Sequence, residues 1–385
     1  MPLRLSFGFA PRVAALYAGL FMLGGIQLPY FPLWLKAKGL DAEQIGFVLA
    51  VPMVVRLFAI PVAARVAEHT GALRGLIATT LGAATLGFAV VGFADGFLTI
   101  LVLVALATAA LSPSTPLAET YALHGLGERN LAYGPVRLWG SVAFVVGTFL
   151  AGYAVDALPA HDLIWLIVAA IALSALAGIA LEPMNFAPHA PALGHSRRLL
   201  TNPVFLAVTA ASALIQGSHA VYYGFSALDW SKAGIDGTSI AALWALGVVA
   251  EIVLFALQGR LPPFLTPPLL MVIGGAGGAL RWLVMAFDPP AAALPFLQLL
   301  HGLTFGATHL GAMALLVRIA PQGRTATAQA YYAIGLGAVM AAMMSLSGWL
   351  YAAYGGRAYA AMALAAVAGC ACGAVAHHAR KRALL

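Results

Sequence analysis

The stretch YGPVRLWGSVAF, Tyr133 to Phe144, opens a long and mostly apolar segment with a strong base near its start. Arg137 lies two residues past Pro135, and few polar residues follow it before Val155. A segment of this length fits a helix that crosses a bilayer of about 30 Å. Pro135 suits the first turn of such a helix because its φ is fixed near the helical value. Arg137 is therefore predicted to lie near the start of a membrane helix and not on a surface in contact with bulk water.

The composition extends this interpretation to the whole chain. Of 385 residues, 62% are hydrophobic and 9% are charged, whereas soluble domains carry about 25% charged residues. Apolar pieces of about 20 to 25 residues recur, and the short alternating strands of a membrane β-barrel are not seen. The sequence predicts an all-α integral membrane protein, and the net charge of +7 is a topology signal and not a nucleic-acid site.

Helix breakers and charges punctuate the chain into twelve predicted spans. Their limits are 12–37, 42–67, 73–93, 97–124, 132–155, 161–181, 202–230, 237–259, 265–287, 291–318, 325–352 and 355–379. Most Lys and Arg residues fall in alternate connections. The positive-inside rule then predicts that both termini and the central loop are cytoplasmic, in a bacterial inner membrane. We call the cytoplasmic side of the spans the predicted inner end and the opposite side the predicted outer end.

The two halves of the sequence resemble each other. WLKAKGLDAEQIG follows the first span and WSKAGIDGTSIA follows the seventh, so that Gly39 pairs with Gly234 at an offset of 195 residues. The same offset places Arg56 on Glu251. The sequence predicts two pseudo-symmetric six-helix bundles, 1–181 and 202–385, joined by a cytoplasmic loop at 182–201. This is the layout of transporters that bind substrate between repeats.

Ionisable residues inside spans are costly in a membrane and are therefore candidate functional residues. They are Arg56, Glu119, Arg137, Glu251, Arg281, His219, His301 and His309. Polar and aromatic residues at helical spacing accompany them. Gln216, His219 and Tyr223 are predicted to share one face, and Gln298, His301, Phe305 and Thr308 another. Both faces would meet a watered cavity; the alternative is that pairs such as Glu119 with Arg137 only tie helices together.

Several strings resemble the major facilitator superfamily and, more closely, its phenylpropionate permease family, a relative of the lactose permease and nucleoside–proton symporter groups. They are YGPVRLWGSVAFVVG, QGSHAVYYGFSALDW, LWALGVVAEIVLFAL, LRWLVM and LQLLHGLTFGATHLGAM. The superfamily signature between spans 2 and 3 is degenerate here, as ARVAEHTGALR. The resemblance covers nearly the whole chain and implies the twelve-helix major facilitator fold.

The resemblance also implies roles for residues. In the lactose permease family a span 4 carboxylate and a span 5 arginine hold substrate, and Glu119 and Arg137 occupy those places. A glutamate, an arginine and a histidine on spans 8, 9 and 10 handle substrate and proton, and Glu251, Arg281 and His301 match them. The sugar symporters carry a glutamate about one turn after that histidine, where this chain has Thr304. A sugar substrate is therefore disfavoured.

We expect proton-coupled uptake of a small aromatic carboxylate, such as 3-phenylpropionate, by alternating access; the substrate rests on the resemblance. Arginine binds a carboxylate through two parallel hydrogen bonds, and Arg137 is the first candidate, with Arg281 second. The remaining candidates for contact with substrate are Glu119, His219, Tyr223, Gln27, Trp34 and Gln298, with an aromatic slot from Tyr30, Phe31, Trp34, Tyr222 and Tyr223. Glu251 is expected to carry the proton, shared with His301, Glu119 or His309.

Other functions stay open at this point. A proton-coupled symporter of a nucleoside or sugar would use Glu119 to accept hydrogen bonds from hydroxyls. A membrane-embedded enzyme lacks support because no HExxH, nucleophile elbow, phosphate loop or metal-ligand cluster is found. A receptor without transport would tolerate neutralisation of Arg137 and Glu251. We expect no cofactor and no metal, and a monomer whose partners are an organic anion, protons and the lipid bilayer.

Overall fold

The computed structural model describes residues 8–184, 197–320 and 324–382, and within these ranges the chain forms helices and turns but no strand. Eleven stretches are long and apolar enough to span a membrane. The longest, Thr327–Ala376, is broken at Gly355–Ala358 and so holds two helices. The twelve predicted spans are thereby confirmed. Most of the predicted central loop, residues 185–196, lies outside the described residues.

By packing, the chain divides into two compact units. The first holds residues up to Leu40, Val54–Pro191 and Trp230–Ala241; the second holds Asp41–Met53, Ala192–Asp229 and Ala242–Leu385. Each unit thus includes one short segment from the other half of the sequence. The segment in the first unit runs from the end of α10 into the start of α11, and the segment in the second unit is the first turns of α2.

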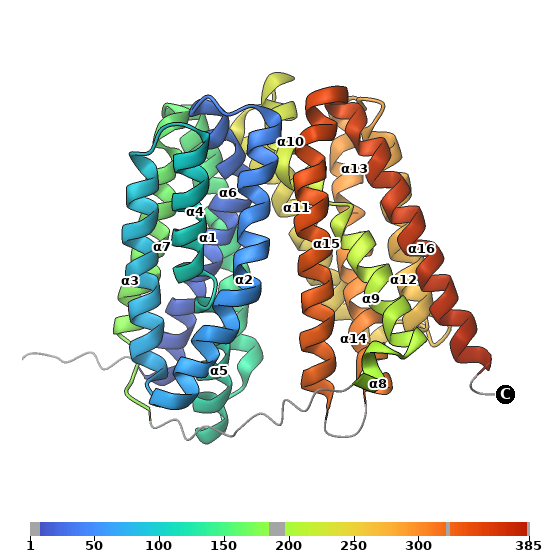
Figure 1. The fold of residues 1–385 in the computed structure, drawn as a ribbon, viewed down its shortest axis with the longest axis horizontal. Coiled ribbons are helices and arrows are strands. Elements are labelled where there is room, and N and C mark those ends of the chain that lie inside the picture. The colour runs from blue at the N-terminus through green and yellow to red at the C-terminus, as the bar shows by residue number, and fades with distance from the viewer. Residues whose placement is uncertain (1–7, 185–196, 321–323, 383–385) are drawn as a thin grey trace, which may run out of the picture. The chain divides into compact units, whose positions relative to one another are not determined.

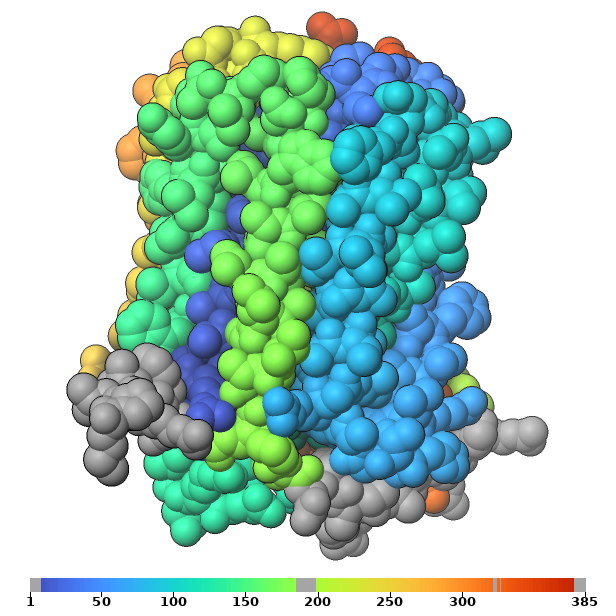
Figure 2. Space-filling view, turned by 90° about the vertical axis from the view of Figure 1, so that its left-hand side faces the viewer, coloured from blue at the N-terminus to red at the C-terminus, as the bar shows by residue number. Residues whose placement is uncertain are grey.

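The helices of the first half of the sequence are α1 (Phe9–Ala37), α2 (Ala42–Thr70), α3 (Leu73–Gly92), α4 (Phe97–Leu111), α5 (Ser114–Glu128), α6 (Tyr133–Ala157), the 3₁₀ turn η1 (Ala160–Asp162) and α7 (Leu163–Ile179) (Figure 1). α1 is one continuous helix that includes Pro29 and Pro32. Pairs α1·α6, α3·α7 and α1·α7 are the main contacts. Figure 2 shows α7 lying along α3, with α1 visible behind it.

The helices of the second half are α8 (Arg197–Leu200), α9 (Pro203–Gly217), α10 (Ala220–Lys232), α11 (Gly237–Leu257), η2 (Gln258–Arg260), α12 (Pro267–Met285), η3 (Ala291–Ala293), α13 (Leu294–Leu299), the π-helix η4 (Gly302–Ala307), α14 (Thr308–Ile319), α15 (Thr325–Tyr354), η5 (Gly355–Ala358) and α16 (Tyr359–Arg382) (Figure 1). α12 packs mainly on α16, and α16 on α9.

Close helix contacts recur at the offset that the sequence predicts. A Cβ on Gly152 would lie 2.5 Å from the Gly237 carbonyl oxygen within the first unit. A Cβ on Gly348 would lie 2.6 Å from the Ala42 carbonyl oxygen within the second. Gly348 lies 196 residues after Gly152, and Gly237 lies 195 residues after Ala42. The internal repeat is therefore visible in the packing, where only glycine allows the backbones to approach so closely.

The starts of α2 and α11 are also capped alike. The Asp41 carboxylate accepts a hydrogen bond from the Gln44 N–H, and the Asp236 carboxylate accepts one from the Ser239 N–H. Asp236 lies 195 residues after Asp41. These caps satisfy N–H groups that have no partner inside a helix. They also fix where each helix begins after its glycine-containing turn.

Candidate substrate and proton site

A buried polar cluster lies in the second unit, on α10 to α13 and the π-helix. Arg281 is fully buried, and its Nη2 donates to the Gln298 Oε1 over 2.7 Å. Its Nη1 lies 3.3 Å from the His301 Nδ1. The guanidinium carbon is 4.7 Å from the centre of the Tyr222 ring and 4.5 Å from that of Trp282. Three candidates from the sequence, Arg281, Gln298 and His301, thus converge in the structure.

The contacts of His301 fix its tautomer. Arginine can only donate, so the Nδ1 of His301 accepts and the ring proton of the neutral imidazole lies on Nε2. That Nε2 is 3.8 Å from the Glu251 Oε2, within ion-pair range but beyond a hydrogen bond. While Arg281 occupies Nδ1, His301 cannot take a second proton.

His219 serves the scaffold of this cluster. Its Nδ1 lies 3.1 Å from the carbonyl oxygens of Ile215 and Gln216, which can only accept, and its Nε2 lies 3.0 Å from the Thr304 hydroxyl. The side chain is fully buried. Both ring nitrogens are occupied, so the residue that we expected to contact substrate instead ties the α9–α10 break to the π-helix.

Three buried hydrogen-bond donors of the cluster have no partner among the described residues. They are the Nε of Arg281, the Nε2 of Gln298 and the Nε1 of Trp244. The ring of Trp244 stacks on Tyr222, with ring centres 4.5 Å apart. Buried polar groups are nearly always satisfied, so donors without acceptors indicate room for an acceptor-rich ligand or for water. Sequence reasoning missed Trp244, although it lies in the quoted string LWALGVVAEIVLFAL.

One edge of the cluster is accessible. The side chains of His301 and Glu251 are 11% and 21% exposed, whereas Arg281 and Gln298 are fully buried behind them. Tyr223 is partly exposed beside the same edge. A ligand would meet the His301–Glu251 pair before it reached the guanidinium.

The predicted face of span 10 is partly wrong. His301, Phe305 and His309 form a stack, with ring centres 5.5 Å and 6.1 Å apart. Thr308 instead points toward Gly274 of α12. The π-helix at Gly302–Ala307 widens one turn, so residues beyond it are rotated from the face that a regular α-helix predicts. His309 consequently lies at the far end of the stack, away from Arg281.

In the first unit, Arg137 and Glu119 do not pair. The Arg137 guanidinium carbon lies 3.8 Å from the centre of the Phe21 ring and 5.5 Å from that of Tyr17. No ion pair joins it to Glu119 in the described part of the chain. Tyr17 is close enough to both side chains for electrostatic interaction. The reading of Glu119 with Arg137 as a simple structural ion pair is therefore wrong.

The aromatic slot that we expected on span 1 is used for packing. Trp34 is fully buried and its Nε1 donates to the His161 carbonyl oxygen over 3.1 Å. Phe31 stacks on Trp34, and the Tyr30 hydroxyl donates to the Gly237 carbonyl oxygen over 2.8 Å. These contacts leave all three side chains buried, so they are not open to substrate in this structure. Gln27 is partly exposed on the same helix and stays a candidate.

Arg56 is exposed, whereas we expected a buried charge. It lies mid-way along α2, the helix with the smallest buried share among the candidate spans. An arginine at such a depth is stable only beside protein or water and not against lipid tails.

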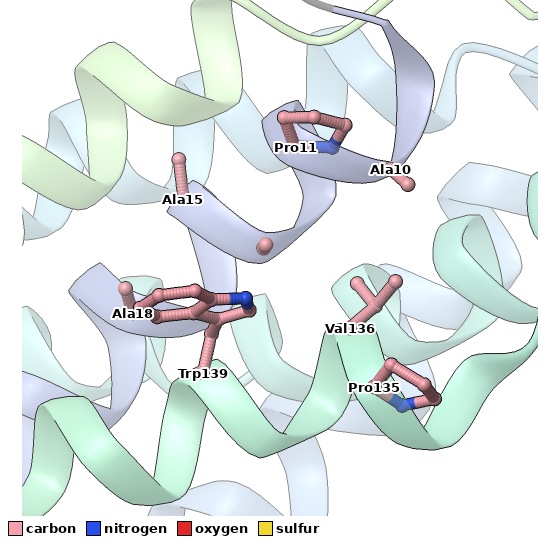
Figure 3. Close-up of a pocket in the computed structure, with 8 residues that line it drawn as sticks. Ala10, Pro11, Ala15, Ala18, Pro135, Val136 and Trp139 are labelled. Atoms are coloured by element: carbon pink, nitrogen blue, oxygen red, sulfur yellow. The ribbon is translucent and has the colours of Figure 1, made fainter.

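A hollow of about 450 Å³ between α1 and α6 is not the site. Its lining is apolar, and Trp139 lies beside Ala18 with Pro135 and Val136 further along α6 (Figure 3). It offers no charged side chain to an organic anion, and its one hydrogen-bonding side-chain group is the indole N–H of Trp139. Among the described residues there is also no group of three or more side chains that could hold a metal ion.

Comparison with known proteins identifies the family. The family model for the MFS_1 like family matches residues 12–361. The chain belongs to this family, within the major facilitator superfamily. It is 35% identical to the "probable 3-phenylpropionic acid transporter" of Escherichia coli K12, covering 91% of this chain and 93% of that protein. It is 28% identical to the maltose permease of Geobacillus stearothermophilus, covering 84% and 83%.

Solved structures agree on the fold. The nucleoside transporter NupG superposes with a TM-score of 0.83 at 15% identity, covering 96% of this chain and 99% of that one. A bacterial homologue of the lysosomal transporter Spinster, in an inward-facing and occupied state, gives a TM-score of 0.72 at 13% identity, covering 96% of both chains. The protein is an integral membrane transporter with the major facilitator fold and is not an enzyme.

Proposed function

We propose that the protein imports a small aromatic carboxylate, such as 3-phenylpropionate, together with protons. The observation that carries the proposal is the buried Arg281. It has no carboxylate partner in the described part of the chain, and its Nε and the adjacent Gln298 Nε2 lack acceptors. A substrate carboxylate would supply those acceptors. The similarity to the E. coli 3-phenylpropionic acid transporter supports an aromatic acid.

We place the carboxylate on Arg281 and Gln298, which reverses the order that we expected from sequence. Arg137 stays the second candidate because its guanidinium already lies against the Phe21 ring. The aromatic ring of the substrate would pack near Tyr223 and Trp244, since aromatic side chains favour offset or edge contacts with another ring. Burial in this cluster keeps the groups out of bulk water, which strengthens the hydrogen bonds to the carboxylate.

The proton would be coupled to the substrate through His301. A substrate carboxylate would compete with the His301 Nδ1 for the Nη1 donor of Arg281. In the structure these two nitrogens are 3.3 Å apart. Once released, His301 can take a proton at Nδ1 and form a charged pair with Glu251. The substrate's negative charge favours protonation of this pair, and by reciprocity protonation favours substrate binding. Substrate and proton would then cross together.

Alternating access about this site, with both termini cytoplasmic in a bacterial inner membrane and the protein a monomer, completes the proposal. The charge bias of the connections supports this orientation. A nucleoside or sugar is the second candidate substrate. It is favoured by the likeness to NupG in fold and by the similarity to the Geobacillus maltose permease.

Uptake into proteoliposomes with an alkaline interior tests the proposal. Radiolabelled 3-phenylpropionate, uridine and maltose are compared, and an internal pH dye reports proton entry. We expect saturable uptake of 3-phenylpropionate with internal acidification, and none for the other two. Saturable uptake of uridine or maltose alone would select the second candidate. Uptake of phenylpropionate without proton entry would contradict the symport mechanism.

A further inference from the structure

A series of polar side chains, one carboxylate followed by tyrosine hydroxyls, extends from the predicted outer end of the second unit toward the site. It begins at Asp229 on α10, whose carboxylate accepts a hydrogen bond from the Tyr351 hydroxyl on α15. The Tyr351 ring stacks on Phe225, with ring centres 4.2 Å apart, and its side chain is 9% exposed. A buried tyrosine held against Asp229 indicates a specific role for that carboxylate.

The next member is Tyr359 at the start of α16. It is fully buried, and its hydroxyl has no hydrogen-bond partner among the described residues. Its ring stacks on Trp282, with ring centres 5.7 Å apart. Its hydroxyl lies within electrostatic reach of Asp229, Tyr351 and Tyr222. Buried hydroxyls are nearly always satisfied, so a bridging water would complete the hydrogen bonding of Tyr359.

Helix geometry shows what the series spans. Tyr222 and Asp229 are seven residues apart on α10, so they lie on one face about 10 Å apart along the axis. Tyr351, from α15, stacks on Phe225, which lies between those two residues on α10. Tyr359, from α16, stacks on Trp282, whose ring centre is 5.9 Å from that of Tyr222. Beyond Tyr222, the Tyr223 ring is 5.6 Å away and interacts electrostatically with Glu251.

We propose that Asp229, Tyr351 and Tyr359 form a proton-entry path from the predicted outer end to Glu251. This inference rests on the proposed proton coupling. An external proton binds the Asp229 carboxylate, which then donates to the Tyr351 oxygen and so reverses their hydrogen bond. The Tyr351 hydroxyl proton is thereby freed to turn away from Asp229 and pass onward as the oxygen takes the proton of Asp229. Tyr359, with a bridging water, and then Tyr222 and Tyr223 repeat the exchange. Each hydroxyl ends with one proton, no electrons move, and one proton arrives at Glu251.

Other charged groups bear on the entrance. Asp288, in the turn after α12, acts electrostatically on Tyr351 and approaches Gly356 of η5. Two carboxylates therefore flank Tyr351 at the predicted outer end. Negative charge at a pore mouth raises the local proton concentration. Asp229 is the nearer of the two because it holds the Tyr351 hydroxyl directly.

The test compares net proton-coupled uptake with substrate exchange, which moves no net proton, in proteoliposomes. The variants are Tyr359→Phe and Asp229→Asn. The matched control is Tyr354→Phe, at the same end of α15 but 58% exposed. In both variants we expect net uptake and internal acidification to slow by about tenfold or more, a lower bound for a positioned proton donor. Exchange should stay within about twofold of the wild type.

Each other outcome is decisive. Net uptake at the control rate in Tyr359→Phe and Asp229→Asn would overturn the path while leaving the proposed symport intact. An equal fall in net uptake and exchange would show a structural role and would also overturn it. Wild-type uptake without proton entry would instead overturn the proposed function. If Asp229→Asn fails to fold, Tyr359→Phe decides alone, since it removes one oxygen and keeps the ring on Trp282.

Discussion

The substitution Arg281→Lys keeps a positive charge in the buried cluster but removes the planar fork that can hold a carboxylate at two points. In the structure the two Nη atoms already serve Gln298 and His301, over 2.7 Å and 3.3 Å. An ammonium group cannot reproduce both contacts and also bind a substrate carboxylate in two places. At least one charge-assisted hydrogen bond to substrate is lost, which is worth about 1.5–3 kcal/mol.

This loss corresponds to a rise in KM for 3-phenylpropionate of about 10- to 150-fold. The assay is initial-rate uptake into proteoliposomes over a range of substrate concentrations, with the maximal rate recorded separately. Because the fork acts on the carboxylate, inhibition of uptake by the uncharged analogue 3-phenylpropanol should change little. Thermal unfolding of the detergent-solubilised variant checks that the fold is kept.

Arg260→Lys is the matched control because Arg260 is exposed at the predicted inner end, in η2. Its KM should equal that of the wild type. A KM for Arg281→Lys within about twofold of the wild type, with a large rise for Arg137→Lys, would move the carboxylate to the first unit. No change in either variant would refute arginine-based recognition altogether.

Three further perturbations address the proton, the scaffold and the predicted outer surface. Glu251→Gln should abolish accumulation driven by a pH gradient while substrate exchange survives, as measured with labelled substrate on both sides. Thr304→Val leaves the His219 Nε2 without its 3.0 Å partner and should lower stability by about 1–3 kcal/mol in thermal unfolding. Hydrogen bonds from the Ser239 N–H and hydroxyl lower the pKa of the exposed Asp236. Such a carboxylate stabilises the fold above the unfolded-state pKa of about 3.9 and loses that effect as pH falls through its folded value. The difference in melting temperature between wild type and Asp236→Asn should therefore shrink on acidification.

Their controls lie nearby. Thr308→Val removes a buried hydroxyl that has no partner among the described residues, so it should cost less stability than Thr304→Val. Equal costs would contradict the assigned role of the Thr304 hydroxyl. Uphill uptake at the wild-type level in Glu251→Gln would exclude Glu251 as the proton carrier. A pH-independent difference for Asp236→Asn would contradict its capping of α11.

The spans were predictable because hydropathy and breakers fix where a membrane helix starts and stops. α2 was predicted at 42–67 and is found at Ala42–Thr70, and α12 was predicted at 265–287 and is found at Pro267–Met285. The convergence of Arg281, Gln298 and His301 was also predictable, because charges inside spans must find partners. Length, polarity and spacing carry this information without any knowledge of the fold.

The residues whose surroundings were predicted wrongly or missed from sequence share one physical cause. A helical pattern shows which residues share a face but not what the face meets. Trp34 is fixed by a carbonyl in the turn before α7, and the conformation of that turn is not encoded locally. Thr308 was assigned to the wrong face because the π-helix at Gly302–Ala307 breaks the regular period. Trp244 was missed because a tryptophan in an apolar span gives no sign that its N–H lacks an acceptor.

The segments exchanged between the two compact units have a consequence for synthesis. The first unit includes Trp230–Ala241, and the Asp156 carboxylate accepts hydrogen bonds from the N–H groups of Gly237 and Thr238, over 2.6 Å and 3.0 Å. Domains usually fold in order as the chain leaves the ribosome. Here the amino-terminal unit cannot complete its packing until the seventh span and the turn after it have been made. The first six spans are therefore made before Asp156 can accept these two hydrogen bonds.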